Sequence, residues 1–529
     1  MEENGQNKKG LSKKVIAIIV AAVLIVGGSA AAFVLITGSP KAKYFKAEKN
    51  TAEFFANKLE ERYQPEFDWA ENTMENPIEN TVELSAQYNG PPTGGGMGMS
   101  PEQVINNSTL TMTSQLNQDE NQFATDLQIN FGGVEMKDIK LFMDGNNAFL
   151  QLPFLEEVLT IQDSDLSKLL QESDPAFEGA EIDFKALFNQ MDGMLSEEDK
   201  EYITDEYLMM VYNELPDDAF DTENETVTVQ DESIDAEKIT FSLTEEQFKE
   251  LITTVLEKAK DDDRLKEIIE KQIRNQFGIF TSGSLPAEME NEVSTAMEDF
   301  EKSIDEAING LEDFQVPDGL TSVIWVKDDL IVKRDFSIGM APKDEEVSTL
   351  SITGGQMLND SEQNLAYEFA VDDSSATVDI NLSNKDNNLK DSITIAGGDI
   401  ELSYSGESTL EDGTREFERT FSFSTPEPNG SGSLNWSGEA TYENDQKTAD
   451  HTISVGLPDL PQDIVSLNIK NDAKTIKEVE QPDDSNVKNL GDMSAQELEM
   501  YFQTEVAGQF QQWLMEIMGA PGGGNMNSF

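Results

Sequence analysis

The residues that could carry acid–base or metal chemistry are few in kind. His451 is the only histidine, and the chain has no cysteine. Multi-histidine zinc sites, thiolate sites and cysteine nucleophiles are therefore excluded. A serine–histidine triad could form only at His451, and no G-x-S-x-G sequence is present to supply its nucleophile. We predict a surface or half-buried histidine in a strand, and we assign no catalytic, cofactor-binding or metal-binding residue and no cofactor.

Carboxylates are so numerous that a pair of them does not indicate any enzyme activity. The chain has 103 Asp and Glu against 37 Lys and Arg, giving a net charge of −66, so pairs suited to glycoside hydrolysis arise by chance. The acidic clusters at 217–223 and 261–263 lack the glycine and terminal glutamate of a calcium loop. We interpret them as solvated loops. The same negative charge repels phosphates and excludes nucleic-acid binding.

Methionine could bind soft copper, and tryptophan could stack on a sugar or a base. The four tryptophans are scattered and form no stacking row, so core packing is the prediction for most of them. The methionines near the two glycine-rich segments are explained by flexible loops and a helix face. These residues are Met97, Met99, Met515, Met518 and Met526, and Trp69, Trp325, Trp436 and Trp513.

A single long apolar run occupies residues 15–36, after four lysines between residues 8 and 14. As a helix it would rise about 33 Å, enough to cross a hydrocarbon core of about 30 Å. A secretory signal peptide with cleavage after residues 30–32 is the alternative, but the run continues to residue 36. We predict an uncleaved single-pass membrane anchor, with the N-terminus cytoplasmic and the C-terminal domain extracellular.

Hydrophobic periodicity predicts the elements beyond this run. Helices are predicted at 47–63, where Pro65 ends the helix, at 197–215, from Thr244, after 261–263, after Pro286 and at 494–518. Period-two alternation predicts an antiparallel meander from residue 321 onward and earlier hairpins. The predicted strands are 82–88, 108–116, 122–130, 134–143, 148–152, 226–229, 238–243, 323–327, 331–338, 348–353, 366–371, 376–382, 392–396, 400–404, 416–424, 432–442 and 451–455.

The helix that begins after Thr244 carries an apolar stripe that must cover something apolar. The stripe consists of Phe248, Leu251, Ile252, Val255 and Leu256, and the neighbouring strands alternate so as to offer one apolar sheet face. If the helix closes directly on that face, the interior is a packed core, which we favour. If the helix lies away from the sheet, the interior is a ligand cavity.

These elements predict an α+β fold. An N-terminal transmembrane helix precedes an ectodomain of two curved, meander-type antiparallel sheets with interposed and C-terminal helices. The predicted divisions are a cytoplasmic tail at 1–14, the transmembrane helix at 15–36, a juxtamembrane helical segment at 37–75, an α+β domain at 76–319, an antiparallel β domain at 320–475, a linker and C-terminal helix at 476–519, and a flexible glycine-rich tail at 520–529.

Two resemblances follow from this order. The N-terminal span, its lysine-rich exit, residues 44–48 and the final Met-rich helix resemble an uncharacterised family of Gram-positive single-span membrane-anchored surface proteins. That resemblance implies no known activity. The strands around 142–153, the hairpin 226–243 and the helix behind it resemble the curved-sheet units of periplasmic lipoprotein carriers, whose concave apolar face holds acyl chains. The lipobox cysteine of such carriers is missing here.

The sequence therefore predicts a non-enzymatic envelope protein on the cell membrane, with a binding or scaffold role. One alternative is a carrier or sensor of an acyl-chain ligand on the outer face of the membrane. A second alternative is a carboxylate-dependent cell-wall hydrolase. The predicted partners are the membrane, through residues 15–36, an unidentified protein or envelope component and a possible hydrophobic ligand, with nucleic acid excluded.

Overall fold

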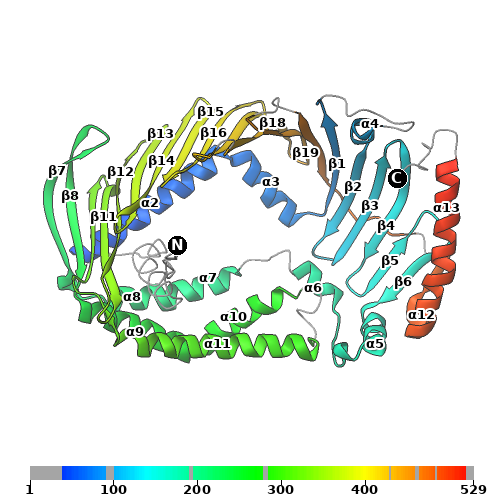
Figure 1. The fold of residues 1–529 in the computed structure, drawn as a ribbon, viewed down its shortest axis with the longest axis horizontal. Coiled ribbons are helices and arrows are strands. Elements are labelled where there is room, and N and C mark those ends of the chain that lie inside the picture. Colours follow the sequence, from blue (N-terminus) through cyan, green and yellow to red (C-terminus); the bar gives the residue numbers. More distant parts are fainter. Residues whose placement is uncertain are drawn as a thin grey trace, which may run out of the picture.

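A single sheet dominates the computed structural model, which describes residues 38–90, 100–189, 195–277, 284–427, 430–458, 464–482 and 485–519. The described strands form one 21-stranded sheet that arches over a layer of helices (Figure 1). Neighbouring strands pair in the order β7, β8, β10 to β20, β1 to β6 and β21, and short β9 pairs with the end of β11. All of these pairs are antiparallel except β6 with β21.

Most strands of the sheet have 8 to 13 residues, whereas β5, β6, β9 and β21 are shorter. In chain order they are β1 (Ile78–Tyr88), β2 (Thr109–Asn117), β3 (Gln122–Phe131), β4 (Val134–Met143), β5 (Asn147–Gln151), β6 (Val158–Gln162), β7 (Phe220–Val229), β8 (Glu232–Leu243), β9 (Phe314–Gln315), β10 (Leu320–Lys327), β11 (Leu330–Pro342), β12 (Ser348–Leu358), β13 (Glu362–Val371), β14 (Ser374–Lys385), β15 (Asn388–Gly397), β16 (Ile400–Glu411), β17 (Thr414–Ser424), β18 (Ser431–Tyr442), β19 (Gln446–Gly456), β20 (Val465–Thr475) and β21 (Val487–Asn489).

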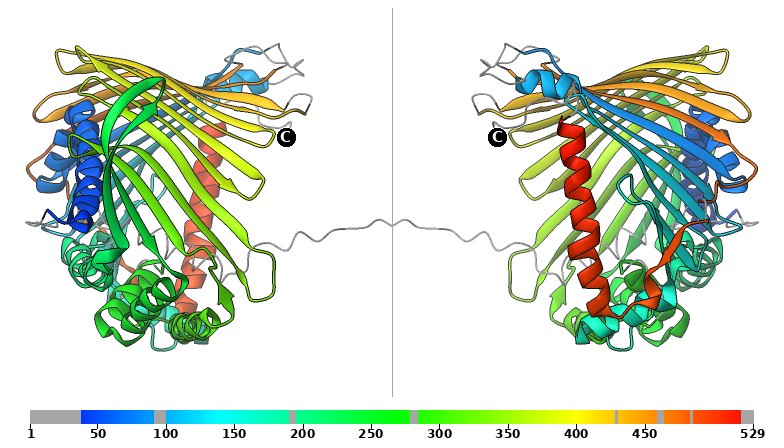
Figure 2. Two further views of the ribbon diagram at one scale, coloured as in Figure 1. Left: turned by 90° about the vertical axis from the view of Figure 1, so that its left-hand side faces the viewer. Right: turned by 90° about the vertical axis from the view of Figure 1, so that its right-hand side faces the viewer.

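Helices lie beneath the arch and at one edge of the sheet (Figures 1 and 2). They are α2 (Pro40–Arg62), α3 (Gln64–Glu75), α4 (Pro101–Asn106), α5 (Asp163–Ser173), α6 (Phe184–Asn189), α7 (Glu197–Ile203), α8 (Met209–Glu214), α9 (Glu245–Asp261), α10 (Asp263–Asn275), α11 (Ala287–Leu311), α12 (Ala495–Tyr501) and α13 (Ala507–Gly519). The helix predicted to end before Pro65 does so at Arg62, and a new helix, α3, begins at Gln64. Pro65 lies in the first turn of α3, where a proline costs no hydrogen bond.

Tight turns set the register of the meander. Asp328 and Asp329 both have positive φ, as do Asp386 and Asn387, which is the backbone that a two-residue type I′ hairpin requires. Asp and Asn tolerate this conformation better than most residues. The meander predicted from residue 321 is therefore present, and its strands alternate two faces over their full length.

The prediction of two separate sheets is wrong. β1 pairs with β20 from Ile78 opposite Thr475 to Tyr88 opposite Val465, which joins the N-terminal strands to the meander. β8 pairs with β10 from Leu243 opposite Leu320, although α9, α10 and α11 intervene in the sequence. Both pairings connect strands far apart in the chain, and local periodicity carries no information on such partners. The domain boundaries at 319 and 475 remain a prediction.

The membrane-anchor predictions are also corrected. None of the helices that the structure describes is long and apolar enough to cross a membrane, and residues 15–36 lie outside the described part of the chain. The described part of the chain thus contains no transmembrane helix of the kind predicted. The signal anchor, the membrane partner, the Gram-positive cell envelope and the extracellular location were inferred from that helix, and the described structure gives them no support.

The stripe on α9 closes on the sheet. Phe248, Leu251 and Ile252 are buried in one apolar cluster with Ile239 of β8 and Ile324 of β10. Val255 and Leu256 are only partly buried against that cluster. The capping box of Thr244 with Gln247 begins the helix as predicted. This end of the arch therefore has a packed core rather than a cavity.

Truncating the buried part of the stripe should be costly. We expect Leu251→Ala to lower the free energy of unfolding by about 2–5 kcal/mol, because it leaves a cavity in a close-packed core. Leu256→Ala is the matched control on the same helix and should cost clearly less, since Leu256 is already partly exposed. Urea unfolding followed by circular dichroism measures both. Equal costs at the two positions would contradict this packing.

Candidate functional site

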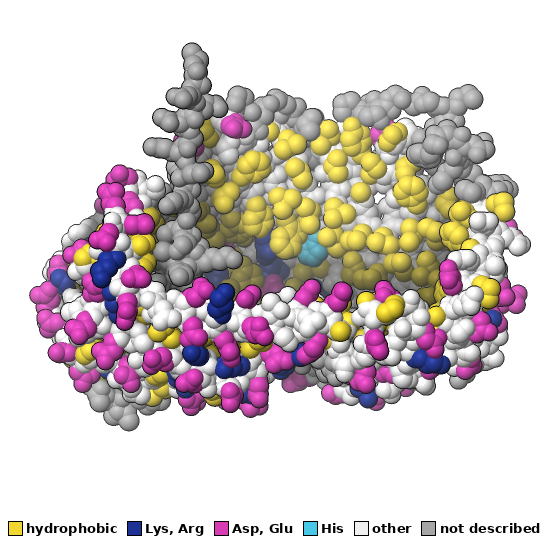
Figure 3. Space-filling model, turned by 60° about the horizontal axis from the view of Figure 1, so that its bottom comes forward, with side chains coloured by type: hydrophobic (Ala, Val, Ile, Leu, Met, Phe, Trp, Pro, Cys, Tyr) yellow, Lys and Arg dark blue, Asp and Glu magenta, His cyan; other side chains and the backbone are white. Residues whose placement is uncertain are grey.

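The face of the sheet that points under the arch, called here the concave face, is apolar and largely uncovered along the middle of the sheet. Directly paired residues point to the same side, so register places one apolar side chain after another on this face. Thirteen of them are 37–54% exposed: Met112, Phe131, Phe369, Val371, Ile395, Ile400, Leu402, Phe421, Phe423, Leu434, Val455, Val465 and Leu467. Figure 3 shows these hydrophobic side chains as a continuous lining of the hollow.

Two helices cover one end of these strands and leave the other end open. Arg415 of β17 is 2% exposed and binds Glu66 of α3 at 2.5 Å (Nε to Oε1), and its Nη2 donates to the Arg62 carbonyl at 2.8 Å. Arg62 of α2 forms a buried ion pair with Asp391 of β15. Charge-assisted bonds of this kind are strong and directional. They hold the junction of α2 and α3 over the turn end of β15 to β17.

A third ion pair fixes the start of α2 on the same face. Nη2 of Arg334, on β11, lies 2.6 Å from both carboxylate oxygens of Glu48. The Tyr44 hydroxyl pairs with Ser322 of β10 at 2.7 Å, and burial raises the pKa of Tyr44 well above its usual range. α2 is thus anchored by polar contacts in an otherwise apolar interface, between the packed core and the open face.

A polar cluster lies in the middle of the concave face. The Arg419 guanidinium carbon lies 4.6 Å from the Phe417 ring centroid and 4.7 Å from that of Trp436, a cation–π arrangement. The His451 ring is 5.8 Å from Trp436 and 5.6 Å from Phe417. Lys447 lies on the same face of β19, four residues before His451 and about 13 Å along the strand from it. We call Arg419, Trp436, His451 and Lys447 the Arg419 cluster.

Glycine makes room for this cluster. Gly438 is opposite both Phe417 and His451, and a Cβ at Gly438 would lie 2.2 Å from the Asp450 carbonyl and 3.1 Å from His451 Nδ1. Only a residue without a side chain fits there. Basic side chains and a histidine are visible at the floor of the hollow in Figure 3.

Positive charge gathers on this face despite the net charge of −66. Four of the six arginines in the sequence, Arg62, Arg334, Arg415 and Arg419, lie on the concave face or against it. Within the described strands β12 to β20, the alternation places a single acidic side chain on this face, Asp391. Asp391 is already paired with Arg62.

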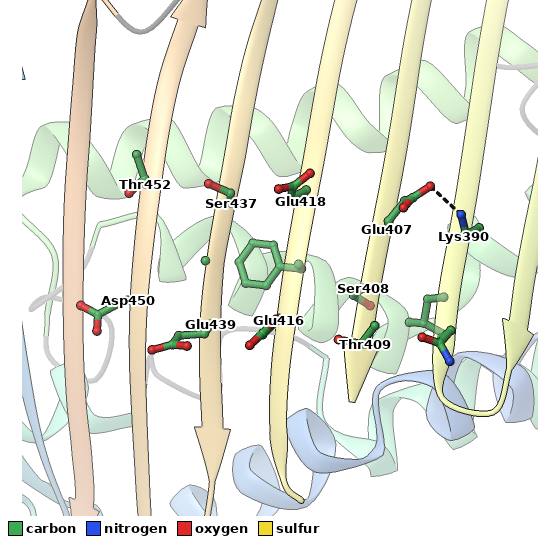
Figure 4. Close-up of a pocket in the computed structure, with 14 residues that line it drawn as sticks. Lys390, Glu407, Ser408, Thr409, Glu416, Glu418, Ser437, Glu439, Asp450 and Thr452 are labelled. Atoms are coloured by element: carbon green, nitrogen blue, oxygen red, sulfur yellow. Dashed lines mark hydrogen bonds and ion pairs between the residues drawn. The ribbon is translucent and has the colours of Figure 1, made fainter. Parts of the chain in front are cut away.

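The opposite, convex face is acidic instead. A shallow depression of about 540 Å³ lies there over β15 to β19, lined by Glu416, Glu418, Glu439 and Asp450 among others. Figure 4 shows these carboxylates side by side on neighbouring strands, with Glu407 paired to Lys390 at 2.9 Å. All are exposed and project from one flat surface. They do not face each other across a cleft, as a two-carboxylate hydrolase requires.

The residues singled out from the sequence have mostly structural places. Trp325 is buried and donates to Glu225 at 3.0 Å, and Trp513 packs on Phe154. Met515 is exposed on α13. Met97, Met99 and Met526 and the side chain of Met518 lie outside what the structure describes. No group of three or more His, Asp or Glu within the described residues is arranged to hold a metal ion.

The acidic clusters at 217–223 and 261–263 serve as contacts and caps. Asp217 lies 3.6 Å from Lys41 of α2, and Asp262 caps α10 through the Leu265 amide. Burial alone would raise the pKa of Asp262, but hydrogen bonds from that amide and from Tyr202 and Tyr207 outweigh it and lower the pKa. Asp217 and Asp262 therefore have partners within the protein itself.

The sequence predicts a surface or half-buried histidine in a strand, and in the structure His451 is half-buried within β19. Sequence reasoning missed Arg419 and the role of Trp436. A usable signal was present: Arg415 and Arg419 alternate with Phe417, Phe421 and Phe423 on one face of a strand. Charged residues on the otherwise apolar face of a strand indicate either an ion pair or a binding site.

Comparisons with known proteins do not identify the chain. No family model matches it, and no curated protein matches it. Solved structures that align include OccK11 (OpdR) of Pseudomonas aeruginosa, at 4% identity and a TM-score of 0.23, covering 76% of this chain and 96% of that one. The outer membrane protein OpdK of the same organism gives 6% and 0.23, covering 76% and 99%. Salmonella typhi OmpF gives 7% and 0.19, covering 76% and 97%. Likenesses this low carry no argument about fold or function.

The lone histidine offers a direct measurement of the cluster. Burial lowers the pKa of His451, Lys447 and Arg419 lower it further, and Asp450 opposes them. We expect the imidazole of untagged protein to titrate below its usual value of about 6.5 in an NMR titration. The unfolded chain then binds this proton at higher pH than the folded chain. The contribution of neutral His451 to the free energy of unfolding is therefore complete above about pH 6.5 and is lost as the pH falls.

The charges around His451 can be separated by substitution. Lys447→Met should raise the pKa of His451, because it removes a neighbouring positive charge. Lys390→Met, which removes an exposed lysine from the convex face, should leave it unchanged. A His451 pKa at or above 6.5 in the unsubstituted protein would contradict this description of the site.

Proposed function

We propose that the protein binds the acyl chain of an amphiphilic ligand on the concave face, as a lipid carrier or holder. The observation that supports this is the row of half-exposed apolar side chains on one face of long paired strands. Soluble proteins seldom leave so large a contiguous apolar surface uncovered, and such surfaces mark binding sites. The helices described here cover the β7 to β11 end and the turn end of β15 to β17.

The form of the surface favours an elongated, flexible ligand. Phe421 and Phe423 lie beside Leu434 of β18 and Leu402 of β16, so the apolar surface continues across strands as well as along them. It offers many dispersed contacts and few hydrogen-bond donors, which suits acyl chains better than a sugar or a peptide backbone. The resemblance to the curved sheets of lipoprotein carriers points the same way, and the carboxylate geometry of the convex face gives the hydrolase no support.

Charges placed on the concave face should weaken binding of an apolar probe. The test uses a pyrene-labelled dodecanol, which is neutral, and the full-length chain. Phe421→Asp/Phe423→Asp should weaken binding about tenfold or more, which is a loss of at least about 1.4 kcal/mol of binding free energy. Because both phenylalanines are more than 40% exposed, the variant should keep most of its stability. Pyrene fluorescence gives the affinity and circular dichroism gives the fold.

The matched control adds the same charges to the same strand. Ser422→Asp/Ser424→Asp places two carboxylates on the convex face of β17 and should leave probe binding unchanged. If the unsubstituted protein does not bind the probe, or if both variants bind equally well, the proposal is wrong. A change of oligomeric state in the Phe421→Asp/Phe423→Asp variant, without probe binding by the unsubstituted protein, would show that the face seats a second copy instead.

A further inference from the structure

We infer that the Arg419 cluster binds the anionic head group, a carboxylate or a phosphate, of the ligand whose acyl chain lies on the concave face. This inference rests on the proposed function and specifies its ligand as an acidic amphiphile. It depends on three observations: buried donors without acceptors, uncompensated positive charge and the position of the cluster along the strands.

Several buried nitrogen atoms at this place make no hydrogen bond. They are Nε1 of Trp436, Nδ1 of His451 and Nη1 of Arg62, a residue that is 5% exposed. Native proteins rarely leave buried donors unsatisfied, and each such group calls for an explanation. Indole and guanidinium nitrogens can only donate. An acceptor with several lone pairs, such as a carboxylate or phosphate oxygen, matches this set.

The positive charge of the cluster is not neutralised by the protein. Arg62 and Arg415 have Asp391 and Glu66 as partners. Within the described residues, Arg419 and Lys447 have aromatic rings as their close contacts and form no ion pair. Burial lowers the pKa of Lys447, and the charge of Glu66 opposes that change. Arg419, a cation without an acidic partner among the described residues on an apolar face of a strongly acidic protein, gives a local attraction for one anionic group, and Lys447 adds positive charge nearer the end of the strands held by α3.

The order of residues along β17 fits an amphiphile laid along the strand. Arg415 lies at the end held by α3, Arg419 lies in the middle, and Phe421 and Phe423 lead to the open apolar end. From Arg419 to Phe423 the strand rises about 13 Å. A head group at Arg419 would therefore place the first part of its acyl chain on Phe421 and Phe423 and beside Leu434.

Two pyrene-labelled probes that differ only in the head group test this inference. They are dodecanol and dodecanoate, measured on the full-length protein. The unsubstituted protein should bind dodecanoate about tenfold tighter than dodecanol, as charge-assisted hydrogen bonds allow. Arg419→Gln should remove this preference and leave dodecanol affinity unchanged. Lys447→Gln, at the edge of the cluster, should reduce the preference in the same direction. Lys390→Gln, on the convex face, should keep it.

The pKa of His451 provides a second measurement, which the head group of the probe would not change if Arg419 had only a structural role. Dodecanoate should raise the pKa of His451 in an NMR titration, because an anion beside the ring favours the imidazolium. Dodecanol should not.

The outcomes separate this inference from the proposed function. Equal affinity for both probes, or a preference that survives Arg419→Gln, would overturn the head-group site while leaving the apolar face as a binding surface. Failure of both probes to bind would overturn the proposed function together with the inference. Inorganic phosphate that raises the pKa of His451 when neither probe binds would show a site for a free anion, and would also overturn the inference.

Discussion

The pairing of β1 with β20 is the contact on which the rest of the structure depends. Without it, the meander would end at β20 with an open edge, and the strands β1 to β6 would form a separate small sheet. With it, eleven residue pairs from Ile78 opposite Thr475 to Tyr88 opposite Val465 join both parts in one register. Because register decides which side chains share a face, this pairing also makes the concave face continuous.

The sheet is too long to be covered by its own helices, and the distribution of cores reflects this. One apolar cluster joins α2 and α9 to β8, β10 and β11, and a second joins β2 to β5 with Phe184, Phe188 and Val293. Between these clusters the concave face of β12 to β20 has few buried apolar residues, such as Leu389 and Phe417. The arch is thus closed at its two ends and open in its middle, which is where the Arg419 cluster lies.

Much of the local structure could be predicted, and the global arrangement could not. Hairpins such as the one turning at Asp328 and Asp329, and the capped helix after Thr244, follow from residue type and spacing alone. The partners of β1 and β8 depend on contacts far apart in the chain, so the single sheet was missed. The concave site was missed for a related reason: alternation shows that Phe421 and Phe423 share one face of their strand, but it does not show whether that face is covered.

Polar contacts decide which part of the face stays open. An apolar helix could pack at many positions along an apolar sheet, whereas the ion pairs Arg334–Glu48, Arg62–Asp391 and Arg415–Glu66 define one position for α2 and α3. Buried ion pairs add little net stability but penalise any arrangement that separates them. We infer that their role here is to hold α2 and α3 at the turn end of the strands. Arg419 follows the same strand pattern as Arg415 but forms no ion pair within the described residues, so its positive charge stays in the uncovered middle of the face, against the rings of Phe417 and Trp436.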